Sequence, residues 1–174
     1  FAFHTDWFKL HDTSRQRAVT IRHRIARQTE GRITLDFRFM LPRAMEGAAW
    51  ELRDLERVAV GVVCHDGALS HETSTLPVAL TSLESNHEYG IRVVADLGAK
   101  TADIYVDGEL KAKASPFVHP VRSVDYVLVK TGDAATGDMF LPLVSVNKGY
   151  LVCETFATCG VGRVPADWDA KPQA

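Results

Sequence analysis

Alternating apolar and polar residues dominate the sequence, beginning with two segments near the N-terminus. One face of the segment 19–25 presents Val19, Ile21, His23 and Ile25. After a turn at Glu30-Gly31, one face of the segment 32–41 presents Ile33, Leu35, Phe37 and Phe39. A period of two residues is typical of a strand with one buried face, so both segments are predicted to be antiparallel strands. His23 lies on the apolar face and is predicted to be a core residue.

The same pattern predicts a meander of three strands in the segment 88–115. Residues 91–96 and 101–106 alternate in the same way, and the chain returns through Asp107-Gly108 into the run ELKAKAS. An Asp-Gly pair favours a tight hairpin because both turn positions need positive φ. We expect the apolar side chains of this meander to share one core with those of the earlier strands: Phe37, Phe39, Ile104 and Val106.

Further short runs extend the pattern to about ten strands. They are residues 57–64, 76–80, 123–130 and 139–156. Residues 48–57 fit neither the strand period nor the helix period, so they are predicted to be a strand or a short helix. The fold class is therefore predicted to be all-β, an antiparallel two-sheet jelly-roll sandwich. We place this module at residues 1–156 and interpret residues 157–174, which have no periodicity, as a linker or tail leading toward a further module.

Length, charge and cysteine content narrow the classes of function. A chain of 174 residues is expected to form one domain. The net charge of −2 offers no electrostatic case for nucleic acid or for an anionic membrane, and no apolar run is long enough for a membrane helix. The chain begins at Phe1 without Met, which favours a processed chain or a piece of a larger protein. An odd number of cysteines (Cys64, Cys153 and Cys159) allows at most one internal disulfide and leaves their redox state open.

Two parts of the chain resemble known families. The run YGIRVVADL followed by TADIYVDGEL resembles the paired strands of concanavalin A-like, laminin-G-type jelly rolls, with Tyr89 at the aromatic position and residues 105–108 as the hairpin. The C-terminal KGYLVCETF and GRVPADW are similar to the junction between β-sandwich modules of bacterial polysaccharide-degrading proteins, including α-L-rhamnosidase-like enzymes and polysaccharide lyases. The resemblance implies an accessory module of such a protein.

The catalytic motifs of jelly-roll enzymes are missing from the sequence. Glycoside hydrolysis needs two carboxylates on either side of the scissile bond, and the nearest run of acids, Asp54 to Glu56, lacks a partner. A Gln-Ile-His lyase strand is also missing. If the chain is nevertheless a lyase of uronate polymers, we expect a Tyr or His base with arginines that neutralise the carboxylate, and this set is Arg92, Tyr105, Arg38 and His65.

The outward face of the sandwich is the candidate binding surface. Recognition of sugars needs planar hydrogen-bonding groups and an aromatic ring. The outward residues with this chemistry are Asp36, Arg38, Arg92, Asp103 and Tyr105, with Trp50 or Tyr89 expected nearby. The same residues could instead form cross-strand ion pairs on a solvated face, or contact a neighbouring module. His65 to Gly67 and His71 to Thr73 are predicted loops that could contact sugar or calcium; no other metal or cofactor is expected.

These observations predict a non-catalytic carbohydrate-associated module of a bacterial polysaccharide-degrading protein, which binds glycan or docks on a catalytic domain of the same protein. One alternative is a jelly-roll lyase acting on a uronate polymer. Another is a laminin-G-like domain that binds proteins. An extracellular or periplasmic location is favoured over the cytoplasm.

Overall fold

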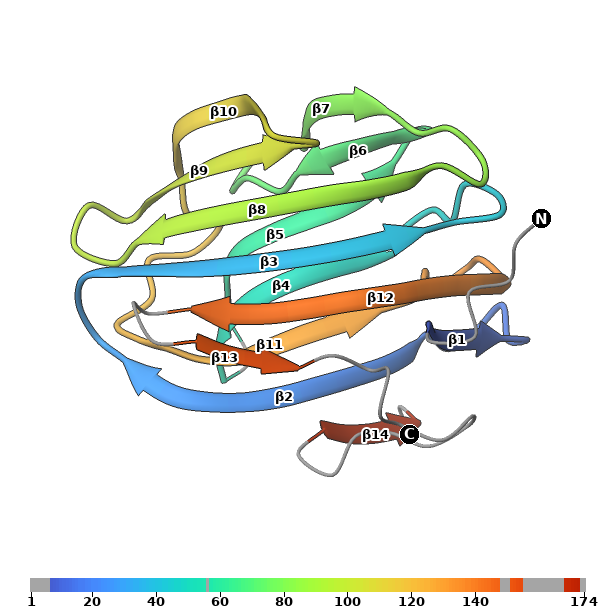
Figure 1. Ribbon diagram of the computed structural model, residues 1–174, viewed down its shortest axis with the longest axis horizontal. Coiled ribbons are helices and arrows are strands. Elements are labelled where there is room, and N and C mark those ends of the chain that lie inside the picture. The colour runs from blue at the N-terminus through green and yellow to red at the C-terminus, as the bar shows by residue number, and fades with distance from the viewer. Residues whose placement is uncertain (1–6, 56, 148–150, 155–167, 173–174) are drawn as a thin grey trace.

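Two antiparallel sheets lie face to face in the computed structural model, which describes residues 7–55, 57–147, 151–154 and 168–172 (Figure 1). The front sheet of Figure 1 has the order β1-β12-β3-β8-β9-β10, and β13 pairs with the same edge of β12 as β1 does. Its strands are β1 (Phe8–Asp12), β3 (Arg32–Met40), β8 (Glu88–Asp96), β9 (Thr101–Val106), β10 (Glu109–Pro116), β12 (Gly137–Asn147) and β13 (Leu151–Glu154).

The back sheet has the order β14-β2-β11-β4-β5-β6-β7 (Figure 1). Its strands are β2 (Val19–Gln28), β4 (Ala49–Asp54), β5 (Arg57–His65), β6 (Ala68–His71), β7 (Val78–Ser82), β11 (Val124–Lys130) and β14 (Trp168–Pro172). The chain alternates repeatedly between the sheets, so strands far apart in sequence are neighbours. The predicted all-β, two-sheet sandwich is confirmed, and the described residues include no helix that could span a membrane.

The core lies between the sheets and follows the predicted alternation. Phe37, Phe39, Ile104 and Val106 are all buried in it. The turn after β9 also has the expected form, because Asp107 and Gly108 have φ of 49° and 85°. His23 is buried as predicted. The inner face of the front sheet is thus fixed by packing, which sends every second residue of β3, β8 and β9 to the outer face.

The ambiguous segment 48–57 contains strand β4, and its last residue, Arg57, begins β5. Trp50 and Leu52 enter the core, while Ala49 and Glu51 on the other face are buried as well. Pairing with β5 also changes register between Leu52 and Arg53. A strand buried on both faces and interrupted by a bulge has no clean two-residue period, which explains the weak signal.

Four strands were not predicted from the sequence. These are β1, β6, β13 and β14. The segment 139–156 was predicted to be a single strand, but its described residues form β12 and β13, which pair antiparallel with each other. Strand β14 pairs with β2 and therefore extends the back sheet within the part of the chain interpreted as a linker or tail. Residues 155–167 and 173–174, which include Cys159, lie outside the described residues.

Candidate functional site

Four polar side chains form a row across the outer face of the front sheet. Ser145 of β12 is paired in register with Asp36 of β3, Asp36 with Arg92 of β8, and Arg92 with Tyr105 of β9. The row forms because each residue lies one position from a buried apolar neighbour, so the pleat turns all four outward. Four segments distant in sequence thereby bring their polar groups to one surface.

Gly90 opens a space beside this row. It pairs directly with Arg38, so the β8 partner of that arginine has no side chain. A Cβ at Gly90 would meet the Oδ1 atom of Asp107 at 3.6 Å, an ordinary contact. The Gly90 N–H donates to the same Oδ1 atom at 2.7 Å, which ties the β9–β10 turn to β8. The result is a depression of about 830 Å³. Residues of this outer groove include Asp36, Arg38, Glu88, Arg92, Tyr105 and Asp107.

Both arginines of the outer groove are paired with carboxylates. Arg92 Nε donates to Asp36 Oδ1 at 2.6 Å, and Arg38 Nη1 donates to Glu88 Oε1 at 3.2 Å. The hydrogen bond and the charge of Asp36 raise the pKa of Arg92 above its usual value. With Asp107 included, the groove residues have three carboxylates for two guanidinium groups. The groove therefore presents fixed donors and acceptors side by side rather than excess positive charge.

Most of the predicted outward residues meet at this groove. Asp36, Arg38, Arg92 and Tyr105 all line it. Asp103 lies on the same outer face, but its Oδ1 atom accepts the Ala114 N–H at 2.7 Å and so holds β10 against β9.

The two other aromatic candidates are buried. The Trp50 ring is 1% exposed and stacks on Phe37 with ring centroids 5.1 Å apart. Tyr89 is also in the core, where its hydroxyl donates to Ser82 O and accepts the Glu84 N–H. The prediction that Trp50 contacts ligand is wrong, because the inward pleat of β4 places its ring between the sheets.

His65, predicted to begin a loop, is instead the last residue of β5 and belongs to a different cluster. Its Nδ1 atom is 2.8 Å from Glu46 Oε1, and this hydrogen bond is the main reason that the pKa of His65 is raised. Ligand atoms of Glu46, His65 and Asp66 lie within 4.8 Å of one another. Ca²⁺ takes about six to eight oxygen ligands, whereas this cluster offers two carboxylates and an imidazole, so calcium here stays a prediction.

His71 does not belong to an exposed loop. It is the last residue of β6, is fully buried, and its Nδ1 atom is 3.1 Å from Gly61 O. Burial lowers its pKa. The expectation that His71 contacts sugar or calcium is therefore wrong. The neighbouring Cys64 on β5 is a buried free thiol, and burial, with a smaller contribution from Glu46, raises its pKa to about 12.

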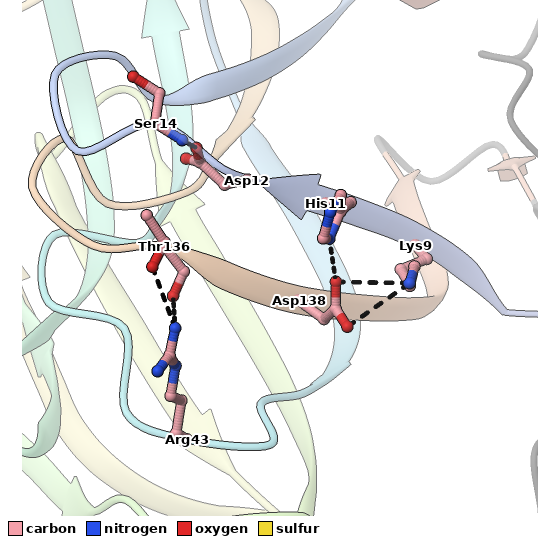
Figure 2. Close-up of polar contacts among 7 residues, drawn as sticks. All are labelled: Lys9, His11, Asp12, Ser14, Arg43, Thr136 and Asp138. Carbon is pink, nitrogen blue, oxygen red and sulfur yellow. Dashed lines mark hydrogen bonds and ion pairs between the residues drawn. The ribbon is translucent and has the colours of Figure 1, made fainter.

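Charged side chains of β1 and β12 form a second polar cluster on the outer face. His11 Nδ1 is 2.6 Å from Asp138 Oδ1, and Lys9 Nζ is 3.4 Å from the same oxygen (Figure 2). Figure 2 also shows Arg43 bonded to Thr136, through Nη2 to the carbonyl oxygen and to Oγ1. This cluster was not predicted from the sequence, because β1 and β12 are separated by more than a hundred residues and nothing local signals their pairing.

Comparisons with known proteins are limited to structure. No family model and no curated protein matches this sequence. The structure is similar to a region of a sialidase, with a TM-score of 0.73 and 13% identity over 83% of this chain and 16% of that chain. An alginate lyase from Corynebacterium sp. matches with a TM-score of 0.53 and 15% identity, over 70% of this chain and 61% of the lyase.

A SAP-like pentraxin from Limulus polyphemus matches over nearly its whole length. The TM-score is 0.60 with 10% identity, and the match covers 99% of this chain and 95% of the pentraxin. At such identities the likeness shows the fold alone. The fold is a concanavalin A-like jelly-roll sandwich, and the neighbours with this fold include proteins that act on carbohydrates. This chain spans less than two thirds of the length of the sialidase and the lyase chains.

Proposed function

We propose that this chain is a non-catalytic carbohydrate-binding module, and that the outer groove of the front sheet is its binding surface. The in-register row of Asp36, Arg92 and Tyr105 at the groove is the observation that supports this most directly. A carboxylate held beside a guanidinium offers a planar acceptor and a planar donor to adjacent hydroxyls of a sugar. The Tyr105 ring supplies an aromatic surface in the same row.

The charge balance of the groove favours neutral sugars over uronates. Arg38 and Arg92 already have carboxylate partners, so a ligand carboxylate would compete with Glu88 and Asp36. Binding of a neutral glycan should therefore depend weakly on ionic strength, whereas binding of a uronate polymer would weaken markedly as salt screens the charges. This salt dependence separates the two ligand classes without any mutation.

The lyase alternative is supported by the position of Arg38, Arg92 and Tyr105 at one groove. His65, the fourth member of that set, is not among the residues that line it. Incubation with alginate and other uronate polymers, followed by ultraviolet absorbance of the unsaturated product, tests this alternative. Formation of product would replace our proposal with a lyase function.

Binding is tested first by affinity electrophoresis and a glycan array that includes neutral, rhamnose-rich and uronate polysaccharides. Arg92→Ala should abolish retention by any polysaccharide that retains the wild type. Arg32→Ala is the matched control, because Arg32 pairs with Asp96 on the same outer face at 3.4 Å but does not line the groove. Equal loss in both variants, or no retention by any polysaccharide, would contradict the proposal.

The wider setting of the module is also a proposal. Similarity to a region of a much longer sialidase chain supports a module within a larger polysaccharide-degrading protein, with bacterial origin and an extracellular or periplasmic location as expectations. If the chain binds no glycan but binds another domain of its parent protein, its role is docking. Capture of a protein partner from outside its own chain would instead support the laminin-G-like alternative.

A further inference from the structure

Apolar side chains adjoin the outer groove on the same face of the front sheet. Met40 of β3 is paired with Glu88, a groove residue, on one side and with Phe140 of β12 on the other. Phe140 is in turn paired with Lys9 of β1, and the Trp7 ring, just before β1, lies 6.3 Å from the Phe140 ring between centroids. We call Met40, Phe140 and Trp7 the apolar shelf. The shelf and the groove form one continuous surface.

A bulge in β12 is what turns Phe140 toward the outer face. Phe140 pairs with Met40 and Leu143 pairs with Arg38, so β12 uses three positions where β3 uses two. Leu141 within this stretch is fully buried, and Pro142 follows it. Proline has no backbone N–H to donate to the hydrogen bonds between strands, so within a sheet it is tolerated at a bulge such as this one. Without the extra residue, Phe140 and Ser145 would face opposite sides of the sheet.

The chemistry of the shelf complements that of the groove. The Trp7 and Phe140 rings, inclined at 60°, offer apolar surface. Lys9 is the charged neighbour of Phe140, and Glu88 is the charged neighbour of Met40. Aromatic surface next to a few fixed polar groups is how proteins hold the apolar face and the hydroxyl edge of a sugar together. In the groove, the aromatic side chain beside the polar groups of the outer face is Tyr105, because the ring of Phe37, which also lines the groove, is buried in the core.

We propose that the apolar shelf is a second contact region of the binding surface, and that the ligand is a chain of several sugar units lying diagonally across the strands from Tyr105 to Phe140. This inference rests on the proposed function. Tyr105 and Phe140 lie three strand spacings apart across the sheet and four residues apart along β3. The diagonal between them is therefore about 20 Å. A single sugar unit cannot cover that distance, so the surface is matched to the interior of a polysaccharide rather than to a monosaccharide.

Continuity with the groove favours a glycan as the occupant of the shelf. The His11, Lys9 and Asp138 cluster lies on its far side, so the apolar area is narrow and has charged groups on two sides. A protein partner that buried the shelf would also have to cover these charges, at a cost in desolvation. A sugar chain in contrast can place ring faces on Trp7 and Phe140 and keep its hydroxyls in water.

The test compares disaccharides and hexasaccharides derived from cellulose, xylan and mannan by isothermal titration calorimetry. The wild type should bind the hexasaccharide of one series at least about tenfold more tightly than its disaccharide. Phe140→Ala should remove most of that difference and leave disaccharide affinity unchanged, whereas Arg92→Ala should weaken both. Trp7→Ala should have the effect of Phe140→Ala, and it should also abolish the change in tryptophan fluorescence that the hexasaccharide causes.

Leu76→Ala is the control for loss of an exposed apolar side chain, because Leu76 is 76% exposed and precedes β7 of the back sheet. Trp7→Ala lies outside the strands, so it tests the shelf even if Phe140→Ala fails to fold. If the wild type binds disaccharide and hexasaccharide equally, or if both shelf variants bind like the wild type, the shelf inference fails and the groove proposal stands. If the wild type binds no glycan at all, both fail.

Discussion

Each sheet has a glycine within a strand on its outer face, and these two glycines, Gly61 and Gly90, have different surroundings. At Gly61 of β5, an added Cβ would overlap the carboxylate of Glu72 and approach its Cδ atom to 3.1 Å. At Gly90 of β8, the same Cβ would meet Asp107 at an ordinary contact distance. The back sheet fills its gap with a side chain of its own, whereas the front sheet leaves the gap open.

This difference separates a structural surface from a candidate binding surface. Glu72 lies against Gly61 beside Glu51, which is buried and bonded to Arg53 at 2.5 Å. The outer face of the back sheet at this point is therefore committed to internal charge pairs. A glycine within a strand indicates close approach of another group, but its sequence context does not show whether that group belongs to the protein or to a ligand.

The largest effect on stability is expected when a charge replaces a side chain on the inner face of the front sheet rather than on its outer face. Ile104→Asp should unfold the domain, because Ile104 is fully buried and an unpaired charge there costs several kcal/mol against a total stability of roughly 5–15 kcal/mol. Tyr105→Ala, one residue away on the outer face, should fold normally. Thermal melts of both variants measure this. Collapse of Tyr105→Ala with an intact Ile104→Asp would show that the register of β9 is wrong.

The next largest effect concerns Gly61. Gly61→Ala should lower the free energy of unfolding by about 1–3 kcal/mol, because Glu72 must leave the position that the new methyl group occupies. Urea denaturation measures the loss. The double variant Gly61→Ala with Glu72→Ala should regain part of it, since the overlapping side chain is then gone. Full stability in the single variant would mean that Glu72 has room elsewhere.

Glu72 should also make stability depend on pH. Burial, followed by the nearby charge of Glu51, raises its pKa above the ordinary value of 4.5, while Lys130, Arg53 and His119 oppose the shift. Because the folded pKa is the higher one, Glu72 stabilises the fold fully below pH 4.5, and this contribution is lost as pH rises through the folded pKa. Relative to Glu72→Gln, the wild type should lose stability over that window. Parallel pH profiles would contradict the shift.

The smallest effect is expected at Gly90. Gly90→Ala should change the free energy of unfolding by no more than about 1 kcal/mol in either direction, because alanine restricts the unfolded chain and this offsets the small cost of the new contact. The methyl group meets Asp107 at 3.6 Å, so no side chain has to move. Chemical denaturation beside Gly61→Ala gives the comparison directly. If Gly61→Ala and Gly90→Ala lowered the free energy of unfolding equally, the space beside Gly90 would be no more open than the space beside Gly61.

Period-two patterning was sufficient to predict the meander and its buried face. It placed Phe37, Phe39, Ile104 and Val106 in one core, and it placed Asp36, Arg38, Arg92 and Tyr105 together on the other side, because β3, β8 and β9 pair without a shift in register. Wherever the register is regular, alternation alone determines which side chains meet.

The missed residues lie where that regularity ends or where pairing is distant. The β12 bulge shifts the period between Phe140 and Ser145, so no simple alternation joins them on one face. Trp50 lies on a strand that is buried on both faces, so no two-residue period in the sequence indicated that its ring faces the core. The Gly90 gap depends on the residue opposite it, Arg38, more than fifty positions earlier in the chain.

The thiol of Cys64 has a kinetic consequence for the whole sandwich. Alkylating reagents attack the thiolate, and burial keeps Cys64 both protonated near neutral pH and out of their reach. Modification must therefore wait until β5 detaches from its neighbours. In a variant with Cys153 and Cys159 replaced by serine, the alkylation rate measures how often β5 detaches from its neighbours. It therefore reports local opening of the back sheet while the protein as a whole remains folded.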